Sequence, residues 1–365
     1  MEQKVLVRYA EIGLKGKNRP WFENKLINNI KTVLNQSLQA IKTQKQILIS
    51  GEIDLEKLKT VFGIAWYAPV KVVENNFSAV SQAALKLIRP KKTFSVRAHR
   101  ELEVNLGEII RTKKKIAVDL DHPGQTIYVA EAGDQAYVFN QKIAGPGGLP
   151  VGTSGKALCL LSGGFDSIAA AYLLAKRGAQ VDCLHFHVFQ DSGKVLDTKI
   201  KTIVDRLRTW TLSKKLFLAS YLPFQLAVLG LERGDQPQEL VVYRRLMVRV
   251  GEVLAKKSGY QALVLGDSLG QVASQTLENI VAVDRAVCLP IFRPLIGLDK
   301  TEIIDLVRKI GLYEETIKPY KDCCSLISSH PSTRADLPKV QNLEKRIKIS
   351  QIVKKITRDV QSVAL

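Results

Sequence analysis

The chain has 365 residues, and its 46% hydrophobic and 24% charged residues are typical of a folded protein of two or three domains, which excludes extensive disorder. The net charge of +19 is spread over both halves and favours a polyanionic partner, a nucleic acid before an acidic membrane surface. No apolar run approaches the roughly 20 residues of a membrane-spanning helix, and no signal-peptide pattern opens the chain, so we expect a cytoplasmic protein without a membrane partner.

Residues 1–75 predict a small ferredoxin-like unit in which strands and helices alternate. Residues 4–9 alternate as a strand does, and apolar side chains recur at helical spacing after Pro20. The remaining predicted elements are a strand at 47–50, a helix at 55–62 and a strand at 70–74.

A second small unit is expected over residues 76–145. Its predicted elements are a helix at 79–88, a strand at 93–98, a helix around 106–111, and a pair of strands at 126–130 and 135–140. The two units are rich in Lys and Arg and contain no convergent acid and base pair. This composition indicates a binding module rather than a catalytic one.

A break follows at residues 145–155, where five glycines and two prolines in GPGGLPVGTSG disfavour both helix and strand. Beyond it, strands and helices alternate up to about residue 265. The first strand, at 157–161, is a continuous apolar run of the kind found in parallel strands buried on both faces. Residues 146–365 therefore predict a doubly wound parallel-sheet domain, and the fold class is α/β.

The strongest chemical motif, SGGFDS at residues 162–167, lies between that first strand and the next helix. A loop in this position points backbone N–H groups at one spot. Gly163 and Gly164 allow phosphate oxygens to approach the backbone, Ser162 and Ser167 add hydroxyl donors, and Asp166 can cap the helix or hold Mg²⁺. The structural alternative is a glycine turn with a capping Asp. The buried strand before the loop favours phosphate binding.

The Lys-Ser/Thr ending of a Walker A loop is absent from this motif. The motif instead resembles the PP-loop of enzymes that cleave ATP between the α and β phosphates. Such enzymes adenylate a substrate and release pyrophosphate, so the resemblance implies ATP and Mg²⁺ as cofactors.

Five blocks of the chain follow the order found in one protein family. They are LVRYAEIGLKGKNR at 6–19, KIAGPGGLPVGTSGKALCLLSGGFDS at 142–167, LGDSLGQVASQTLENI at 265–280, PIFRPLIGLDKTEII at 290–304 and YKDCCSLI at 320–327. Together they resemble the tRNA 4-thiouridine synthetases, the tRNA sulfurtransferases of the ThiI family. The resemblance implies a ferredoxin-like domain, a tRNA-binding THUMP domain and a PP-loop ATP pyrophosphatase domain.

The chemistry that this resemblance implies is the activation of O4 of the uridine at position 8 of tRNA as an adenylate. A persulfide sulfur then attacks C4, and AMP leaves. Carried over residue by residue, the family's remaining nucleotide contacts fall on seven positions: Leu160, Leu161, His185, Phe186, Arg244, Gly266 and Gln275. Without the family, His185 would be interpreted as a satisfied histidine at a strand end, and Arg245 could exchange roles with Arg244.

Sulfur transfer requires a thiol, and nearby positive charge lowers a thiol's pKa. Alignment on the family's cysteine segment implies that Cys324 is the catalytic thiol, with Cys323 second. Lys and Arg surround this segment in sequence, and if it is extended, the two side chains point to opposite sides. Cys159 fits a buried strand, and Cys183, near the expected ATP site, is a candidate resolving thiol. The chain has no C-x-x-C pair, so the cysteines are not expected to hold a metal ion or an iron–sulfur cluster.

The chain departs from the family in ways that affect its partners. It ends without the rhodanese domain that some members carry, so a cysteine desulfurase or another external sulfur donor is expected. A stretch usual in the THUMP region is missing near 96–110. The resemblance also implies a homodimer. The alternatives are another PP-loop tRNA-modifying enzyme, a tRNA-binding relative that has lost thiolation, and a sulfur-carrier role in thiamine synthesis.

Overall fold

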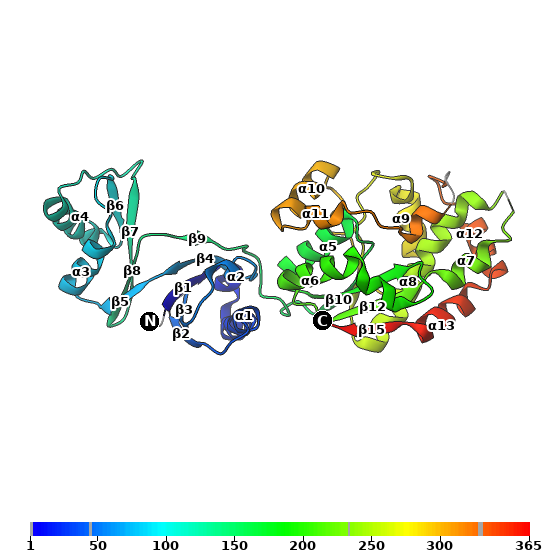
Figure 1. Ribbon diagram of the computed structural model, residues 1–365, viewed down its shortest axis with the longest axis horizontal. Helices are drawn as coiled ribbons and strands as arrows, with labels where there is room; N and C mark the ends of the chain where they lie inside the picture. Colours follow the sequence, from blue (N-terminus) through cyan, green and yellow to red (C-terminus); the bar gives the residue numbers. More distant parts are fainter. Residues whose placement is uncertain (1–2, 44–45, 233, 328–330) are drawn as a thin grey trace. The chain divides into compact units, whose positions relative to one another are not determined.

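The computed structural model describes residues 3–43, 46–232, 234–327 and 331–365, apart from the side chains of residues 324 and 325. The chain divides into two compact units, residues 1–150 and 151–365, and each is described by itself (Figure 1). Within the described ranges, no helix is both long enough and apolar enough to cross a membrane.

Unit 1 begins with the expected ferredoxin-like arrangement. Strands β1, β3 and β4 pair antiparallel, with β1 in the middle, and α1 covers the sheet through Leu26 and Ile30, which are buried. The sheet order is β2-β3-β1-β4-β9. The elements are β1 Gln3–Tyr9, α1 Arg19–Leu34, β2 Gln39–Thr43, β3 Gln46–Gly51, α2 Leu55–Leu58, β4 Ile64–Pro69 and β9 Ile143–Ala144.

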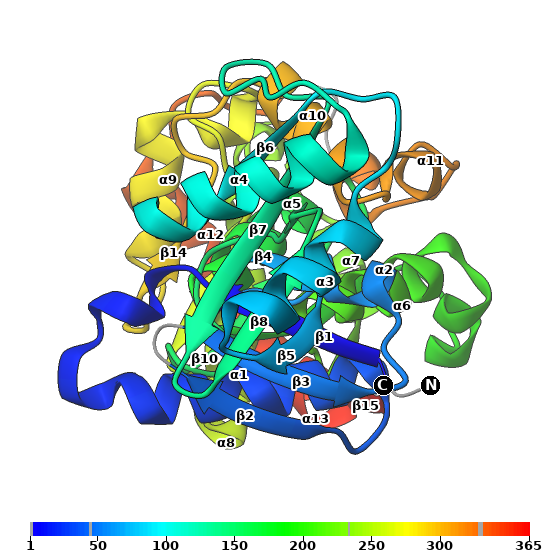
Figure 2. The same cartoon turned by 90° about the vertical axis from the view of Figure 1, so that its left-hand side faces the viewer.

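The second sheet of unit 1 has four strands in the order β5-β8-β7-β6. In Figure 2, which faces this unit, α3 and α4 accompany the sheet, with α3 against β5 and β8 and α4 against β6. A tight turn at Gly133, whose φ is +61°, joins β7 to β8. The elements are β5 Lys71–Glu74, α3 Phe77–Leu87, β6 Phe94–Arg97, α4 Arg100–Lys114, β7 Gln125–Ala132 and β8 Gln135–Phe139.

The strand expected at 70–74 is present, but it does not belong to the ferredoxin-like sheet in which it was predicted. It is β5, which pairs with β8 of the second sheet, whereas the ferredoxin-like sheet is completed by β4 at Ile64–Pro69. In return, β9 at Ile143–Ala144 crosses back to pair with β4. A small apolar cluster that includes Leu6, Tyr137 and Phe139 contains residues of both sheets. The two halves of unit 1 therefore exchange strands and share an apolar cluster.

Unit 2 has the expected doubly wound α/β architecture. Its six-stranded sheet has the order β14-β13-β10-β11-β12-β15, and every pairing is parallel except that of β15 with β12. The strands are β10 Lys156–Leu160, β11 Gln180–His187, β12 Lys215–Ser220, β13 Ala262–Val264, β14 Ile291–Phe292 and β15 Gln361–Ala364.

Helices cover both faces of this sheet (Figure 1). Cys159 points toward α5, where its Sγ lies 3.6 Å from the Ser167 carbonyl, and the next residue, Leu160, lies beside Gly251 of α8. Successive strand residues point to opposite faces, so α5 and α8 lie on opposite sides. The helices are α5 Phe165–Lys176, α6 Lys199–Thr211, α7 Leu222–Val228, α8 Glu239–Ser258, α9 Leu277–Asp284, α10 Lys300–Lys309, α11 Tyr313–Thr316, α12 Leu337–Arg346 and α13 Ile349–Asp359.

A buried carboxylate joins three elements of unit 2 at the amino-terminal end of β11. Asp182, 3% exposed, accepts hydrogen bonds from the Tyr260 hydroxyl at 2.8 Å and the Ser213 hydroxyl at 2.9 Å. It also accepts the backbone N–H groups of Lys214 at 2.6 Å and Lys215 at 3.0 Å. The carboxylate therefore satisfies four donors that the sheet edge and its loops would otherwise leave without an acceptor.

We expect Asp182→Ala to lower the free energy of unfolding by about 3 kcal/mol, because two buried hydroxyl groups and two partly buried N–H groups lose their acceptor. Urea unfolding followed by circular dichroism measures the loss. The control is Asp305→Ala, which removes an exposed carboxylate paired with Arg308 and should change stability by less than about 0.5 kcal/mol. Equal urea midpoints for the two variants would contradict the role given to Asp182.

Candidate active site

The phosphate loop, residues 162–167, connects the carboxyl end of β10 to the first turn of α5. Its own hydroxyl groups hold it. The buried Ser167 hydroxyl accepts the Ser162 N–H at 3.2 Å and donates to the Gly164 carbonyl at 3.2 Å. Among the described residues, no side chain caps α5, whose N-cap is Gly164. The first N–H groups of this helix are thus left for a ligand, and the helix dipole favours an anion there.

Two glycines make the close packing around this loop possible. Gly163 has φ +81°, and a Cβ there would lie 2.5 Å from Cδ1 of Ile200. Gly266, just beyond β13, meets the loop directly, since a Cβ there would lie 2.5 Å from the carbonyl carbon of Asp166 and 2.7 Å from the nitrogen of Ser167. The segment after β13 and the phosphate loop are therefore in backbone contact.

Asp166 does not cap the helix but faces two side chains from later in the sequence. One carboxylate oxygen lies 2.8 Å from the Lys300 ammonium, at the start of α10, and the other accepts the Gln271 amide at 3.1 Å. Lys300 is fixed where it stands because Asp299 and Glu302 form a capping box at the start of α10. The sequence analysis missed Lys300, although the predicted block 290–304 contains it.

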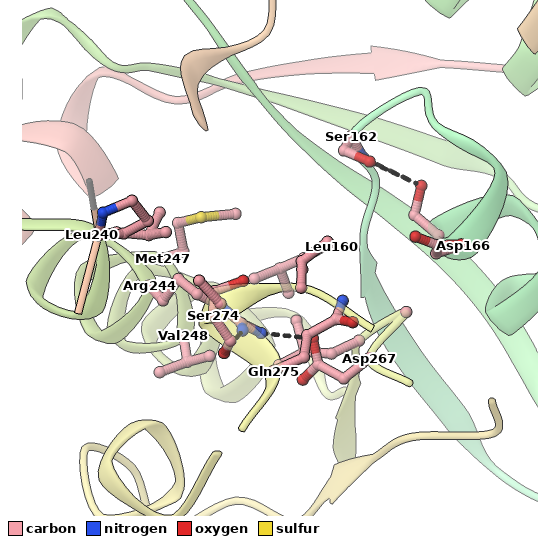
Figure 3. Close-up of a pocket in the computed structure, with 16 residues that line it drawn as sticks. Leu160, Ser162, Asp166, Leu240, Arg244, Met247, Val248, Asp267, Ser274 and Gln275 are labelled. Atoms are coloured by element: carbon pink, nitrogen blue, oxygen red, sulfur yellow. Dashed lines mark hydrogen bonds and ion pairs between the residues drawn. The ribbon is translucent and has the colours of Figure 1, made fainter. Parts of the chain in front are cut away.

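Arg244, on α8, is held by the segment after β13. Its guanidinium donates to the Asp267 carboxylate at 2.5 Å and to the Ser274 carbonyl at 2.6 Å (Figure 3). Asp267 is 3% exposed and also accepts Arg293 at 2.8 Å. Arg245 cannot exchange roles with Arg244, because it is 2% exposed and bonded to Glu344 in a different part of the domain.

A cavity of about 340 Å³ opens beside the phosphate loop. Apolar side chains, among them Leu160, Met247 and Val248, form one part of its lining, and Ser162, Asp166 and Ser167 form another (Figure 3). The lining also includes Arg244, Gly266 and Gln275. Gln275 is buried, and its Oε1 has no hydrogen-bond partner among the described residues, so an acceptor is available in the wall of the cavity.

His185, at the end of β11, links the phosphate loop to the cysteine segment. Its Nδ1 lies 2.8 Å from the Leu161 carbonyl and its Nε2 lies 2.7 Å from the Tyr320 hydroxyl. Burial lowers the pKa of His185 to about 4, so the ring is neutral at neutral pH. A neutral ring that donates from Nδ1 must accept at Nε2, and Tyr320 is therefore the donor.

Five expected nucleotide contacts are not part of the described lining of the cavity: Leu161, Gly163, Gly164, His185 and Phe186. Leu161 is buried and contributes its carbonyl to His185, and Phe186 packs its ring edge against Tyr243 in the core. Lys199, which the sequence analysis also missed, begins α6 close to Gly163. Its ammonium donates to the Thr316 carbonyl at 2.7 Å and lies 6.0 Å from the centre of the Tyr320 ring.

The cysteines have different surroundings. Cys159 and Cys183 lie opposite each other on the adjacent strands β10 and β11, and both are buried free thiols. Burial raises the pKa of Cys159 to about 12 and that of Cys183 well above its usual value. A thiol that stays protonated is a poor nucleophile, which argues against Cys183 as a resolving thiol. Cys323 is 3% exposed and packs in the core.

The cysteine segment is not extended. Residues Cys323–Leu326 form a single 3₁₀ turn, so the alternation expected of an extended chain does not apply. The side chain of Cys324, the expected catalytic thiol, lies outside the described residues. No cluster of three or more His, Cys, Asp or Glu that could hold a metal occurs in the described part of the chain.

Comparison with known proteins identifies the family of the chain. The family model described as "Thiamine biosynthesis protein (ThiI)" matches residues 152–349, and the ThiI ferredoxin-like domain matches residues 4–68. Curated relatives named "Probable tRNA sulfurtransferase" include one from Moorella thermoacetica, 37% identical over 97% of this chain and 95% of the relative, and one from Acetivibrio thermocellus, 34% identical over 99% and 98%.

The chain belongs to the ThiI family. Among solved structures it resembles a 4-thiouridine synthetase in complex with RNA and bound ATP, with a TM-score of 0.89, 31% identity and full coverage of both chains. The expected fold class, with its ferredoxin-like domain and parallel sheet, is thereby confirmed.

The cavity of this ThiI-family chain has the parts that a nucleotide needs. An apolar region next to the buried acceptor of Gln275 suits a base that carries an amino group, and the N–H groups at the start of α5 suit phosphates. Lys300 on Asp166 and Lys199 near Gly163 add positive charge where a pyrophosphate group would develop charge.

We expect Gly266→Ala to weaken ATP binding at least 10-fold, because the added methyl would overlap the backbone of Asp166 and Ser167 and displace the phosphate loop. Isothermal titration with a non-hydrolysable ATP analogue measures the change. The control is Gly297→Ala, since nothing lies within 4 Å of a Cβ at that position. Unchanged ATP affinity in Gly266→Ala would refute the close approach as a requirement.

Proposed function

We propose that this chain is an ATP-dependent tRNA sulfurtransferase that converts the uridine at position 8 of tRNA to 4-thiouridine. The observation that carries the proposal is the convergence of the phosphate loop, Lys300 and the cysteine segment on one region, through the Asp166–Lys300 pair and the Leu161–His185–Tyr320 connection. The family membership and the similarity to a 4-thiouridine synthetase with bound ATP support the same function.

ATP is proposed to bind with its base among Leu160, Met247 and Val248 and its phosphates at the start of α5. Asp166 is the carboxylate nearest to those phosphates and would hold a Mg²⁺ that takes its other ligands from phosphates and water. Arg244, tied to Asp267 and Ser274, would position the wall of the base site rather than act as a mobile phosphate ligand.

The reaction that this arrangement supports begins with attack of uridine O4 on the α-phosphate. An O–P bond forms, the uridine N3 proton is lost to solvent, the bond between the α-phosphorus and the α–β bridging oxygen breaks, and pyrophosphate leaves. The N–H groups of α5, Lys199 and Lys300 stabilise the charge that accumulates on the leaving group. Adenylation turns a poor leaving group at C4 into AMP.

The second half-reaction is sulfur transfer, which we assign to Cys324, with Cys323 second. The terminal sulfur of a cysteine persulfide attacks C4, and AMP leaves. A second thiol then cleaves the remaining S–S bond and becomes the disulfide partner of the cysteine, which releases 4-thiouridine. We infer that a cysteine desulfurase or another external donor supplies the persulfide sulfur.

Unit 1 is proposed to bind tRNA. Its second sheet, with α3 and α4, would be the THUMP domain, placed after the ferredoxin-like sheet and before the PP-loop ATP pyrophosphatase domain. The high positive charge of the chain supports a polyanionic substrate. A cytoplasmic homodimer is part of the same proposal.

The function is tested with unmodified tRNA, ATP, Mg²⁺, cysteine, a cysteine desulfurase and dithiothreitol, with 4-thiouridine measured by nucleoside mass spectrometry. We expect the wild type to thiolate and Cys324→Ser to lose at least 100-fold of the rate, because the sulfur carrier is gone. Cys288→Ser, at an exposed position outside the cavity lining, is the control and should be unaffected.

Two results would overturn parts of this assignment. Thiolation that survives Cys324→Ser but not Cys323→Ser would move the persulfide to Cys323. A wild type that binds tRNA and ATP but forms no 4-thiouridine would refute the proposed function itself.

Tyr320 is a positioning residue in this scheme, because its hydroxyl fixes the cysteine segment to His185 and so to the phosphate loop. We expect Tyr320→Phe to lower kcat for thiolation about 10-fold, equivalent to about 1.4 kcal/mol, with KM for ATP changed less than twofold. Steady-state kinetics with varied ATP separates the two constants.

Tyr260→Phe is the matched control for Tyr320→Phe. It also removes a hydroxyl that is bonded to a buried acceptor in the same domain, but at Asp182 rather than at His185. Both variants should lose similar stability, and only Tyr320→Phe should lose turnover. If kcat falls as much in Tyr260→Phe as in Tyr320→Phe, the loss reflects general destabilisation and Tyr320 has no positioning role.

A further inference from the structure

A second concave region of unit 2 is rich in basic side chains, which make up half of its lining residues. It lies between α8, α12 and α13 and has a volume of about 700 Å³. The charged residues that line it are Arg245 and Arg249 of α8, Arg285 just after α9, Glu344 and Lys345 of α12, and Lys348 before α13. We call this region the basic cleft. It is separate from the nucleotide cavity, with which it shares no lining residue.

The floor of the basic cleft is a buried charge cluster. Arg245, 2% exposed, and Arg249 both donate to the carboxylate of Glu344, and Arg245 also donates to the Ala282 carbonyl. Burial alone would raise the pKa of Glu344, but hydrogen bonds from Arg249 and Arg245 hold it below its usual range. Two fixed guanidinium groups thus face one carboxylate, and the cluster keeps a net positive charge.

The rim of the cleft adds three cations that no acid neutralises. Among the described residues, the charged groups of Arg285, Lys345 and Lys348 form no salt bridge. The neighbouring acids are engaged elsewhere, since Asp284 pairs with Arg293, and Glu232 and Asp235 pair with Arg346. Five cations therefore surround the cleft with a single carboxylate among them.

The backbone brings these cations together through a break between two helices. The helix α12 ends at Arg346, and α13 begins at Ile349. Lys348 joins them in the left-handed conformation with φ +53°, which turns the chain sharply. The exposed polar residues Ser350 and Gln351 of the first turn of α13 complete the lining.

We propose that the basic cleft binds the phosphodiester backbone of RNA. The inference rests on the proposed function, because the RNA is the tRNA substrate of the same enzyme, and it adds a contact surface on unit 2 apart from the nucleotide cavity. The cleft is open and lined by long side chains at its rim, which suits phosphates presented by a rigid duplex. A fixed arginine floor with exposed lysines beside it binds charge without reading sequence.

The test is the salt dependence of tRNA binding by the full chain. The dissociation constant is measured by filter binding between about 50 and 300 mM KCl, for the wild type and for the Lys345→Gln, Lys348→Gln double variant. Each lost phosphate contact lowers the slope of log K against log salt by about one. We expect a slope shallower by about two and, at about 0.1 M salt, a dissociation constant raised about 10-fold or more.

The control is the Lys354→Gln, Lys355→Gln double variant. It removes the same number of positive charges, two, from exposed positions further along α13 that are outside the cleft lining. Its binding should match the wild type within about twofold. An equal loss in both double variants would show a diffuse field instead of a site, and no loss in either would overturn the proposal in favour of another partner, such as an acidic protein.

A second measurement needs no variant. Acetylation of the wild type by an amine-reactive reagent, with and without saturating tRNA, should show protection of Lys345 and Lys348 and none of Lys354 and Lys355. Absence of protection would contradict the basic cleft. The outcome is independent of sulfur transfer: a chain that binds tRNA through the cleft but makes no 4-thiouridine refutes only the proposed function.

Discussion

The approach of Gly266 to the backbone of Asp166 and Ser167 is the constraint on which the candidate site depends. It brings the segment after β13 against the loop after β10, and β13 and β10 are neighbours in the sheet. The phosphate loop then shares one cavity with Arg244 of α8 and with Asp267 and Gln275 of the segment after β13. These residues are far from the phosphate loop in the sequence. A side chain at position 266 has no room, so this approach of the two loops requires a glycine there.

Burial and charge separate the reactive groups of unit 2. The thiols of Cys159 and Cys183 lie inside the sheet, where the absence of water keeps them protonated. Lys199 and Lys300 lie at the loop end of the strands, where their charge faces the candidate phosphate site. His185 lies between the two environments and is neutral, because burial outweighs its hydrogen bond to the Leu161 carbonyl. The doubly wound fold thus places the charged groups of the candidate site at the carboxyl ends of its strands.

The sequence is sufficient for features that neighbouring residues determine. The phosphate loop, the buried strand before it and the glycine-rich break are local patterns, and the parallel sheet follows from the alternation of strands and helices. Pairing is not local: residues 70–74 form a strand as predicted, but their partner β8 lies 60 residues away, and no periodicity reveals it. The same limit explains why Lys199, Lys300 and Tyr320 were missed, since each meets its partner only in the folded chain.

The ends of the six-stranded sheet have a consequence for the behaviour of the chain in solution. A parallel sheet with apolar strands would expose a row of unpaired N–H and C=O groups at each edge, and such edges recruit strands from other molecules. Here one edge is β14, which has two residues, and the other is β15, a four-residue strand that runs antiparallel to β12. Neither gives a second molecule a long template for parallel pairing. We infer that β15 protects the edge of β12 from pairing with strands of other molecules, a role that requires no contact with the cavity.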